Sequence, residues 1–525
     1  MKRTFVALFS AVALLSCATG PSREQGLVER AVQAMGGAEA LAGLRTVTAK
    51  GATKQWEPEQ SDAPGGEMRF ANSATFEVNQ DRAARASRTD WVKNFAYPAP
   101  RTFTYSEIVT PDAGCVIGVD SNGRNAQSMK MTPPVHAMSG FRLATTQREA
   151  RRGNVTALVL EMRSNPDLVL PAADLLAGGR SWPAVAYRDF IVAFDPQTGL
   201  PARVRTLDYD NVWGDVNYDV VYSDWRQVSG VQVPMLRKAE LNGRVIIETA
   251  ITELRYNQPV DTSRLQIPAA IRETAAKPAT GNVPYQWVIR RQFIGTYMDS
   301  DHVSYDMRGS PGLRLQDIAA GVSQVQGGTH HSLLVEMRNH LVVFDAPVTD
   351  AQSAWVVNAA KAKYPGKPIR YVVLTHHHMD HTGGVRGFLA EGAALVVGQG
   401  TAQHYRRVLA SPMTRNPDLK PHDFSRAQII EVAGLYAIND GKREVLAILM
   451  DSPHAKGTLM GYVPDARLGW VTDIWSPGVP LPAKPNPGLV AVVNAVKKAN
   501  IQPERFAGGH GSTADYASLA RLAGQ

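Results

Sequence analysis

The sequence predicts a chain of two parts: an antiparallel, β-rich N-terminal domain that opens with a helix, and an α/β C-terminal domain. Three observations support this prediction. The 525 residues exceed the roughly 250–300 residues at which a single core stops growing. Short β-prone runs separated by turn residues fill the first half, whereas strands and helical spacing alternate in the second half. Hydrophobic content of 44% and charged content of 20% are ordinary for globular proteins, so we expect both parts to fold.

The first residues have the pattern of an export signal. A basic start precedes an apolar run, residues 4–16, that is too short to cross a membrane. The run ends in Leu14-Leu15-Ser16-Cys17, which resembles the lipobox of bacterial lipoproteins, where the cysteine is lipidated after cleavage. We therefore expect residues 1–17 to be a signal peptide with Cys17 as the lipid anchor, and we favour this over ordinary cleavage nearby. Ala18 resembles the outer-membrane sorting pattern, so the expected location is the bacterial cell envelope, facing the periplasm, at the outer rather than the inner membrane.

Residues 24–268 are predicted to form the antiparallel β-rich domain. Apolar residues at helical spacing over residues 26–44, interrupted by two glycines, predict the leading helix. Strands separated by turn residues are expected at 190–194, 202–207, 216–222 and 244–254. The helix-then-meander order, the Asp-x-x-Thr-Gly-Leu-Pro turn at 195–201 and the lipobox together resemble the curved half-barrel of bacterial lipoprotein-carrier proteins.

Charge and cysteine content limit the classes of partner. The formal charge of +8 is scattered, and its densest cluster, Arg148, Arg151 and Arg152, is interpreted as a solvated or anionic-membrane-facing surface. Scattered charge argues against a nucleic-acid groove, so we expect no nucleic-acid partner, and the sequence indicates no protein partner. Cys115 lies in an apolar run and is expected to be a small buried strand residue.

Residues 269–314 are rich in Pro, Gly and Ala and are predicted to be a connector. Residues 315–525 follow as the α/β domain. Strands are expected at 341–344 and 370–374, and helices at 351–362 and 385–390.

The second of these strands runs into a histidine-rich motif, His376-His377-His378-Met379-Asp380-His381, followed by a glycine pair. Residues two apart at the end of a strand point the same way, so His376 and His378 can hold one ion. Asp380 and His381 lie on the turn that follows and can reach a second ion. The glycines allow a tight turn that a Cβ would obstruct. His377 alternates away from its neighbours and is expected to be packed or exposed rather than ligating.

His-x-His-x-Asp-His followed by a glycine pair is identified as the signature of the metallo-β-lactamase superfamily, and His454, Asp473 and His510 follow in the order that the superfamily requires. The resemblance implies an αββα sandwich over residues 315–525, with a dinuclear site of the glyoxalase-II or lactonase type. It assigns three ligands to each metal and one bridging carboxylate to both: His376, His378 and His454; Asp380, His381 and His510; and Asp473.

Imidazole and carboxylate ligands without thiolate favour zinc, so we expect two Zn²⁺ per chain, with iron and manganese as alternatives. Metal binding lowers the pKa of water from 15.7 toward about 7, which would supply a bridging hydroxide. The chain is therefore predicted to be a zinc-dependent hydrolase in which a metal-bridging hydroxide attacks an ester, thioester, lactone or amide bond of a small-molecule substrate. Asp380 is the candidate catalytic residue, because it would orient that hydroxide while ligating.

Three alternatives stay open at this point. In a non-catalytic, ligand-binding envelope lipoprotein the metal domain would be structural, although a structural site has no need of an open pair of ions. A β-lactam hydrolase is disfavoured because the true zinc β-lactamases generally lack a bridging aspartate where this chain has Asp473. An iron-dependent sulfur dioxygenase would use a similar ligand set, but its thiol substrates belong mainly to the cytoplasm.

The sequence gives weaker evidence that other polar residues belong to the predicted metal site. His330 and His331 precede a predicted strand and are interpreted as a loop pair rather than as lining of the cleft. Lys456 is either a surface lysine or a residue that steers an anionic substrate. Asp345 resembles the strand-terminal aspartate of the family, which usually supports the ligands instead of binding metal.

Overall fold

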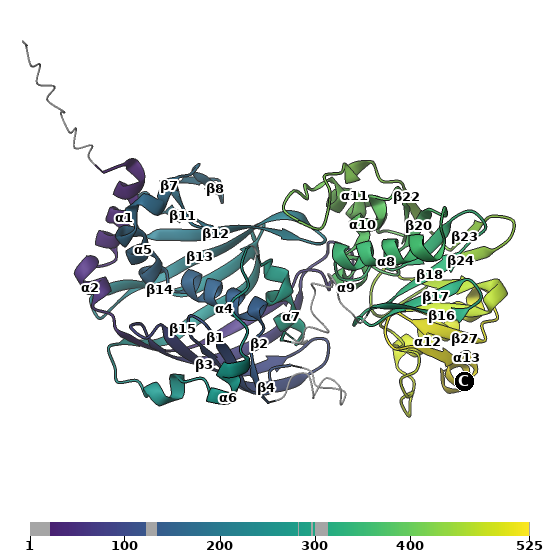
Figure 1. Ribbon diagram of the computed structural model, residues 1–525, viewed down its shortest axis with the longest axis horizontal. Coiled ribbons are helices and arrows are strands. Elements are labelled where there is room, and N and C mark those ends of the chain that lie inside the picture. The colour runs from purple at the N-terminus through teal and green to yellow at the C-terminus, as the bar shows by residue number, and fades with distance from the viewer. Residues whose placement is uncertain (1–20, 122–133, 282, 296–297, 300–312, 524–525) are drawn as a thin grey trace, which may run out of the picture.

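The computed structural model describes residues 21–121, 134–281, 283–295, 298–299 and 313–523. The expected export signal and Cys17 lie outside these residues. Figure 1 shows two parts side by side, the N-terminal part in purple to teal and the C-terminal part in green to yellow. Among the described residues, no helix is long and apolar enough to cross a membrane.

The N-terminal part is built on a thirteen-stranded antiparallel sheet, which confirms the predicted β-rich class. In sheet order its strands are β6 (Val135–Ala137), β5 (Gly114–Gly118), β4 (Arg101–Val109), β3 (Ala86–Phe95), β2 (Arg69–Asp81), β1 (Thr46–Glu57), β15 (Arg244–Tyr256), β14 (Val231–Leu241), β13 (Gly214–Val228), β12 (Pro201–Asp210), β11 (Phe190–Phe194), β10 (Ala184–Tyr187) and β7 (Val169–Pro171). A separate hairpin joins β8 (Leu175–Ala177) and β9 (Arg180–Trp182). The first long strand, β1, therefore lies in the middle of the sheet and pairs with the last, β15.

The leading helix is present and is interrupted where the glycine pair predicts. Helix α1 (Arg23–Ala34) is followed by α2 (Ala38–Ala42). Gly36 between them has a φ of +115°, and a Cβ there would lie 2.5 Å from the carbonyl oxygen of Gly230. Left-handed backbone and close approach both require glycine at this position. The apolar face of α1 packs with α5 (Val155–Ser164) on the sheet.

Helices α4 (Gly140–Gly153) and α5 were not predicted, and α4 buries charged residues. The guanidinium of Arg152 is fully buried, 4.1 Å from the ring centroid of Tyr218. Arg148 donates to the carbonyl oxygen of Val283 at 2.8 Å. The interpretation of this basic cluster as a solvated surface is therefore wrong for Arg148 and Arg152, because their charges face inward. Cys115 is buried in β5, as expected.

The described part of the segment expected as a connector is docked on the N-terminal sheet. It contains α6 (Ala269–Thr274), the 3-10 turn η3 (Tyr285–Trp287) and α7 (Ile289–Ile294). Helix α7 contacts β1 and β2. Tyr285 and Phe293 are fully buried against that sheet and anchor the segment.

The C-terminal part is a sandwich of two sheets covered by helices on both outer faces. The first sheet, in order, contains β16 (Arg314–Ala319), β17 (Val322–Gln326), β18 (Ser332–Glu336), β19 (Leu341–Phe344), β20 (Ile369–Val373), β21 (Ala394–Gly398) and β22 (Ile429–Val432). The second contains β23 (Leu435–Asn439), β24 (Glu444–Leu449), β25 (Leu459–Val463), β26 (Leu468–Val471), β27 (Arg505–Gly508) and β28 (Thr513–Asp515). The helices are α8 (Asp350–Lys363), α9 (Met379–Thr382), α10 (Val385–Leu389), α11 (Ala402–Ala410), α12 (Pro487–Lys498) and α13 (Tyr516–Ala523).

Strand β19 shows why the layers stack in this order. Leu341 and Val343 pack into the cluster shared with α8, α10 and α11, whereas Val342 and Phe344 pack against the second sheet. All four side chains are fully buried, as expected for a strand covered on both faces. A third cluster places α12 and α13 on the far side of the second sheet. The predicted αββα class is confirmed.

Candidate metal centre

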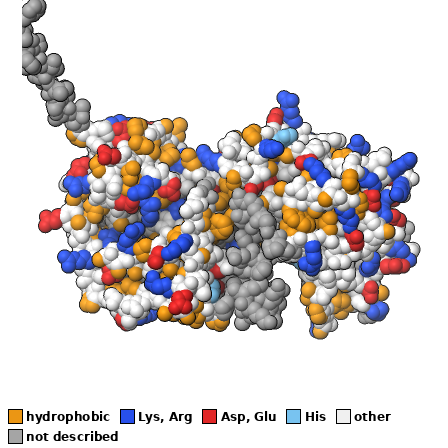
Figure 2. Space-filling model, in the orientation of Figure 1, with side chains coloured by type: hydrophobic (Ala, Val, Ile, Leu, Met, Phe, Trp, Pro, Cys, Tyr) orange, Lys and Arg blue, Asp and Glu red, His pale blue; other side chains and the backbone are white. Residues whose placement is uncertain are grey.

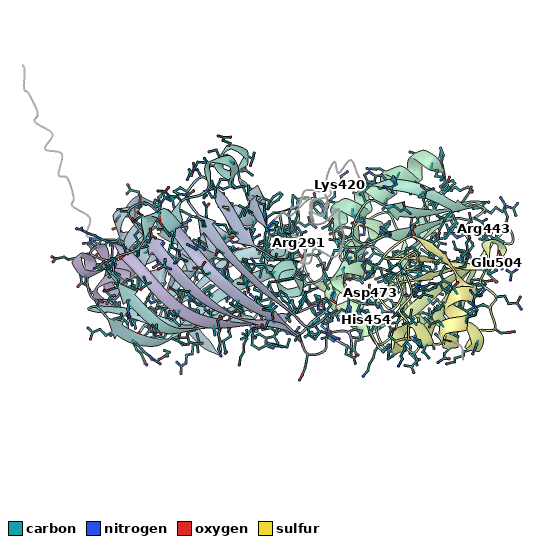
Figure 3. All side chains as sticks on the ribbon, turned by 90° about the horizontal axis from the view of Figure 1, so that it is seen from below. Arg291, Lys420, Arg443, His454, Asp473 and Glu504 are labelled. Atoms are coloured by element: carbon teal, nitrogen blue, oxygen red, sulfur yellow. The ribbon has the colours of Figure 1, made fainter. Side chains whose placement is uncertain are left out.

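All seven predicted ligands converge at one end of the sandwich. Five lie on loops beside its strands, whereas Asp380 and His381 lie on the short helix α9. Together with His330, they form two groups of four residues, in each of which one ligand atom per residue lies within 4.8 Å of all the others. The groups are His376, His378, His454 and Asp473, and then His330, Asp380, His381 and His510. Figure 3 shows His454 and Asp473 on the side of the C-terminal part that faces the N-terminal part.

Asp473 lies between the two groups. Its Oδ2 is 2.9 Å from Nε2 of His454 and 3.2 Å from Nε2 of His376. Its Oδ1 is 3.0 Å from Nε2 of His381 and 2.7 Å from Nε2 of His510. One carboxylate thus turns one oxygen to each group, which is the arrangement that a bridging ligand requires.

The ring nitrogens of the first group are arranged for binding a metal ion rather than for hydrogen bonding to one another. Nε2 of His376 is buried and makes no hydrogen bond, although Asp473 is near. Nδ1 of His378 lies 2.9 Å from Nε2 of His454, so two ring nitrogens face each other. Burial lowers the pKa of His376 and of His378, which leaves both as neutral imidazoles, the form that donates a lone pair to a metal.

The outer ring nitrogen of three ligands meets an acceptor. Nε2 of His378 donates to the Ser61 carbonyl at 2.9 Å, Nδ1 of His381 lies 3.3 Å from Asp345, and Nδ1 of His510 lies 3.1 Å from the Thr329 carbonyl. A carbonyl or carboxylate oxygen only accepts, so each outer nitrogen carries a proton and the inner nitrogen is the one that faces the rest of its group. These contacts fix the tautomer and the orientation of each ring.

Asp345, at the end of β19, contacts a predicted ligand and its neighbours, as expected for a residue that supports the ligands. It is fully buried and accepts hydrogen bonds at 2.8 Å from both the backbone amide and the hydroxyl of Thr375. Burial works against the charged form of His381, but the carboxylates of Asp473 and Asp345 outweigh it and hold the pKa of His381 well above the usual range. Burial alone would raise the pKa of Asp473, yet the surrounding histidines hold it well below its usual range.

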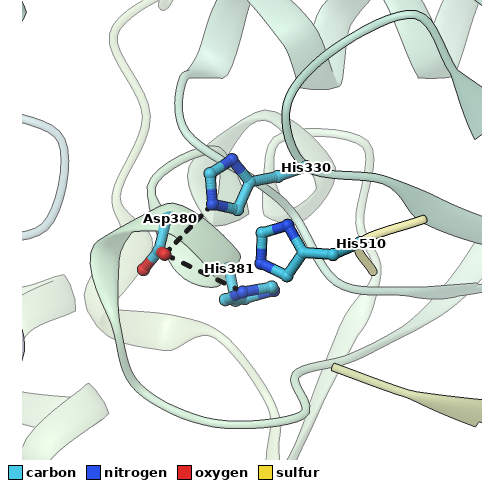
Figure 4. Close-up of side chains that lie close together, drawn as sticks. All are labelled: His330, Asp380, His381 and His510. Carbon is cyan, nitrogen blue, oxygen red and sulfur yellow. Dashed lines mark hydrogen bonds and ion pairs between the residues drawn. The ribbon is translucent and has the colours of Figure 1, made fainter. Parts of the chain in front are cut away.

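His330 belongs to the second group, which the sequence interpretation missed. Its Nε2 is 3.1 Å from Oδ2 of Asp380, and its ring centroid is 4.5 Å from that of His510 (Figure 4). Burial, with the nearby His510, lowers the pKa of His330 to about 4, so its ring is neutral. The interpretation as a simple loop pair holds for His331, which is buried against Gln324, but is wrong for His330.

The N-terminal part also reaches this site, through the β1–β2 loop (residues 58–68). Gln60 and Ser61 of this loop contact Asp380, His377 and His378. His377 is accordingly buried and packed, which is one of the two positions expected for it. In the sequence the loop has the composition of a polar turn between two β-prone runs, and the spacing of its residues does not indicate a contact with a metal centre.

Lys456 also faces this loop. Its amide donates to the carbonyl oxygen of Asp62 at 2.9 Å, while its side chain is largely exposed, with Nζ 3.9 Å from the Asp62 carboxylate.

Residues 325–513 match the family model described as the metallo-beta-lactamase superfamily. Among solved structures, the chain resembles a stereoselective inverting sec-alkylsulfatase from Pseudomonas sp., with 16% identity, a TM-score of 0.31, and coverage of 40% of this chain and 41% of that one. A metallo-beta-lactamase from Pontibacter korlensis matches with 16% identity and a TM-score of 0.31, over 40% of this chain and 97% of that one.

A flavodiiron protein from Giardia intestinalis matches with 12% identity and a TM-score of 0.30, over 40% of this chain and 58% of that one. Identities this low limit each likeness to the fold. This chain spans less than half the length of the alkylsulfatase. Among curated proteins, none matches it significantly.

Proposed function

We propose that this chain, which carries a metallo-β-lactamase superfamily domain over residues 325–513, is a two-metal hydrolase. The observation that carries the proposal is the placement of Asp473, whose two oxygens face two separate groups of histidines. A structural zinc site is closed around one ion. A carboxylate that directs one oxygen to each of two ligand groups instead suits a pair of ions with an open position between them. His376, His378 and His454 would hold one ion, and Asp380, His381 and His510 the other.

A bound metal pair supplies an activated water at neutral pH and polarises the electrophile. The chain's own residues set the geometry around it. Asp473 ties the two groups together, and Asp380 presents the carboxylate that orients the nucleophile. The side chains of His454 and His510 are 23% and 28% exposed, whereas His378 is fully buried. A substrate therefore approaches from the side of His454 and His510.

We assign zinc as the metal, because the two groups contain imidazole and carboxylate without thiolate. The substrate class that follows is an ester, thioester, lactone or amide, as in the glyoxalase-II-like and lactonase-like branches that carry the bridging aspartate. Figure 2 shows acidic and basic side chains interspersed on the face it presents, which supports a small-molecule substrate rather than nucleic acid.

The test combines metal analysis with a substrate panel on one sample of the full chain. We expect about two zinc equivalents per chain, and chelation should abolish turnover and lower the melting temperature. The panel should contain aryl esters, thioesters, lactones, amides and β-lactams, with oxygen uptake on a persulfide as the control for an iron dioxygenase. A folded sample that takes up no metal when zinc is supplied would remove the proposal.

The envelope location is part of the same proposal. The N-terminal sequence supports cleavage before Cys17 and a lipid anchor there, with the catalytic part facing the periplasm at the outer membrane. Labelled palmitate should be incorporated by the parent chain and not by Cys17→Ser. Equal labelling of both would argue for ordinary cleavage instead.

A cavity supports a second candidate function, the binding of an apolar ligand in the N-terminal part. The cavity has a volume of about 310 Å³ and lies between the sheet and helices α4 and α5. Its lining includes Val47, Phe76, Trp91, Val233 and Ile251. This size is at the lower end for small-molecule sites. Uptake of a fluorescent fatty acid by a chain that binds metal but hydrolyses nothing on the panel would favour a carrier over an enzyme.

A further inference from the structure

The β1–β2 loop extends from the middle of the N-terminal sheet to the candidate metal centre of the other domain, where it contacts Asp380 and His378. Glu59, Gln60 and Ser61 are each less than 5% exposed. The carbonyl oxygen of Glu59 faces the amide of Met379 at 3.4 Å, and the carbonyl oxygen of Asp62 accepts from the amide of Lys456 at 2.9 Å. A buried polar loop is stable only where its polar groups find partners, and here those partners belong to the metal-binding domain.

Gln60 joins the loop to a candidate ligand. Its side-chain amide donates to Oδ1 of Asp380 at 2.8 Å. Oδ2 of the same carboxylate faces the second group, 3.1 Å from His330 and 3.9 Å from His381. The amide therefore occupies one oxygen of Asp380 and leaves the other facing the histidines that would hold the second ion with it.

Gln60 is itself held from two sides by the N-terminal domain. The hydroxyl of Tyr97 donates to its side-chain oxygen at 2.5 Å, and Nε of Arg69 donates to its backbone carbonyl at 2.6 Å. The guanidinium of Arg69 also lies 4.7 Å from the ring centroid of Tyr97. Because Tyr97 satisfies the oxygen of the amide, the nitrogen is the end that faces Asp380.

Ser61 acts on the other group through its backbone. Its carbonyl oxygen accepts from Nε2 of His378, which has no access to water. The contact selects the tautomer in which Nδ1 is free to bind a metal. One loop of the N-terminal domain thus orients a ligand in each group.

A second contact holds the domains in this relation. The guanidinium of Arg386 is fully buried and donates to the carbonyl oxygens of Asn211 and Val212, at 2.7 Å and 3.1 Å. The side chain of Asn211 donates to the carbonyl oxygen of Val348 at 2.6 Å. These bonds join the β12–β13 turn of the N-terminal sheet to helix α10 and to the β19–α8 loop.

We propose that Gln60 is a positioning residue of the metal centre, so that the N-terminal domain completes the site of the second ion. This inference rests on the proposed two-metal function and names the part of the N-terminal domain that supports it. The domain therefore has a role in hydrolysis that is separate from any ligand it binds in its own cavity. Tyr97 acts indirectly, because its hydroxyl holds the Gln60 amide in place.

The test uses the full chain and follows zinc binding in two steps by competition with a chromophoric chelator. Gln60→Met keeps the length and burial of the side chain but removes its donor. We expect the weaker of the two zinc affinities to fall about 10–100-fold, the usual effect of losing a contact that supports a ligand, while the stronger affinity is unchanged. Tyr97→Phe should produce a smaller loss at the same step.

Gln55→Met is the matched control, because Gln55 lies on β1, is similarly buried, and has a side-chain oxygen without a hydrogen-bond partner among the described residues. It should leave both affinities unchanged, and the melting temperatures of all variants without metal show whether any of them has lost its fold. If Gln60→Met binds both ions as tightly as the parent, the inference fails while the proposed function stands. If the parent itself binds no metal, the proposed function fails first.

Discussion

Asp345 and Asp473 adopt the same left-handed backbone conformation and contact the two different ring nitrogens of one histidine. Their φ angles are +60° and +61°, and they follow β19 in the first sheet and β26 in the second. Asp345 lies 3.3 Å from Nδ1 of His381, and Asp473 lies 3.0 Å from its Nε2. Aspartate tolerates this conformation better than most residues, and such backbone positions gather at functional sites. Each sheet thus delivers one carboxylate to the same ring.

The first prediction concerns the bridge. Asp473→Asn keeps the shape of the side chain and its tolerance of positive φ but removes the charge that two cations would share. Turnover should fall about 100-fold, at the upper end of the range for a ligand or its support, and metal content should drop below that of the parent. Metal analysis and kinetics on the full panel check this.

Asp465→Asn is the control for the bridge, since Asp465 is a partly exposed aspartate paired with Arg443 away from the centre. It should match the parent in both measurements. Two tightly bound ions and full turnover in Asp473→Asn would show that Asp473 does not bridge, and would reopen the β-lactam alternative.

The second prediction separates two neighbouring histidines. His330 lies beside Asp380, whereas Nδ1 of His331 pairs with Gln324 at 3.1 Å and its backbone amide donates to the Gly509 carbonyl at 2.8 Å. His330→Ala should lower turnover at least tenfold, as loss of a residue that supports a metal ligand does, with little change in melting temperature. His331→Ala should mainly lower the melting temperature. The reverse assignment of effects would place His331, not His330, in the site.

The third prediction concerns the glycine pair after the histidine motif. A Cβ on Gly383 would lie 2.2 Å from the carbonyl oxygen of Val348, although the φ of Gly383 is an ordinary −59°. Close approach, not backbone conformation, is therefore what requires glycine here. Gly383→Ala should lower the free energy of unfolding by about 1–3 kcal/mol, the typical cost of overpacking, as measured by urea denaturation.

Gly434→Ala is the comparison for that measurement, because its Cβ would have no atom within 4 Å. Its free energy of unfolding should stay within about 0.5 kcal/mol of the parent, as for other unconstrained surface sites. If the free energy of unfolding is lowered equally in both variants, the residues around Gly383 can move aside to accommodate a methyl group, and the prediction is wrong.

The fourth prediction concerns pH and stability. Asp350 begins α8, is nearly fully buried, and accepts from the amide of Gly387 at 3.0 Å. Burial raises its pKa to about 7 against the opposing influence of Arg386. The folded chain therefore holds this proton more tightly than the unfolded chain. The stability it contributes is present in full below the unfolded pKa of 3.8 and is lost as the pH rises through about 7.

Asp350→Asn removes that titration. Between pH 5 and pH 8 the parent should lose up to about 3 kcal/mol more unfolding free energy than the variant, because each tenfold difference in proton affinity between the folded and unfolded chains is worth about 1.4 kcal/mol. Melting temperatures across that range are the measurement. Parallel curves for parent and variant would show that Asp350 is ionised in the folded chain throughout.

The fold class and the closeness of His376 to His378 were predictable because local sequence determines them. Strand β19 is apolar at every position, since both of its faces are covered, and β11 lies between clear turn residues. The histidine motif follows a strand directly, so its spacing alone brings His376 and His378 to one side. Period and spacing are properties of neighbouring residues, and a single sequence displays them fully.

The rest depended on contacts between distant residues. Helix α4 was missed because Arg142 and Arg152 occupy its buried face, where a helical pattern would show apolar residues. Arg142 is held inside by Glu107 and Asp120, which come from other elements. Gln60 contacts Asp380 across 320 positions, and nothing near either residue indicates the other.

The position of β1 in the sheet affects how the chain reaches its final structure. Thr53 on β1 is paired with Thr249 on β15, so the middle of the sheet cannot close until most of the N-terminal part has been synthesised. The loop at the end of β1 must then meet Asp380, whose group includes a residue as late in the chain as His510. Pairings between residues this distant form slowly, because the chain loses conformational entropy before the stabilising contacts form. We expect the complete centre to be among the last features to assemble, so that acquiring activity reports that both domains have folded.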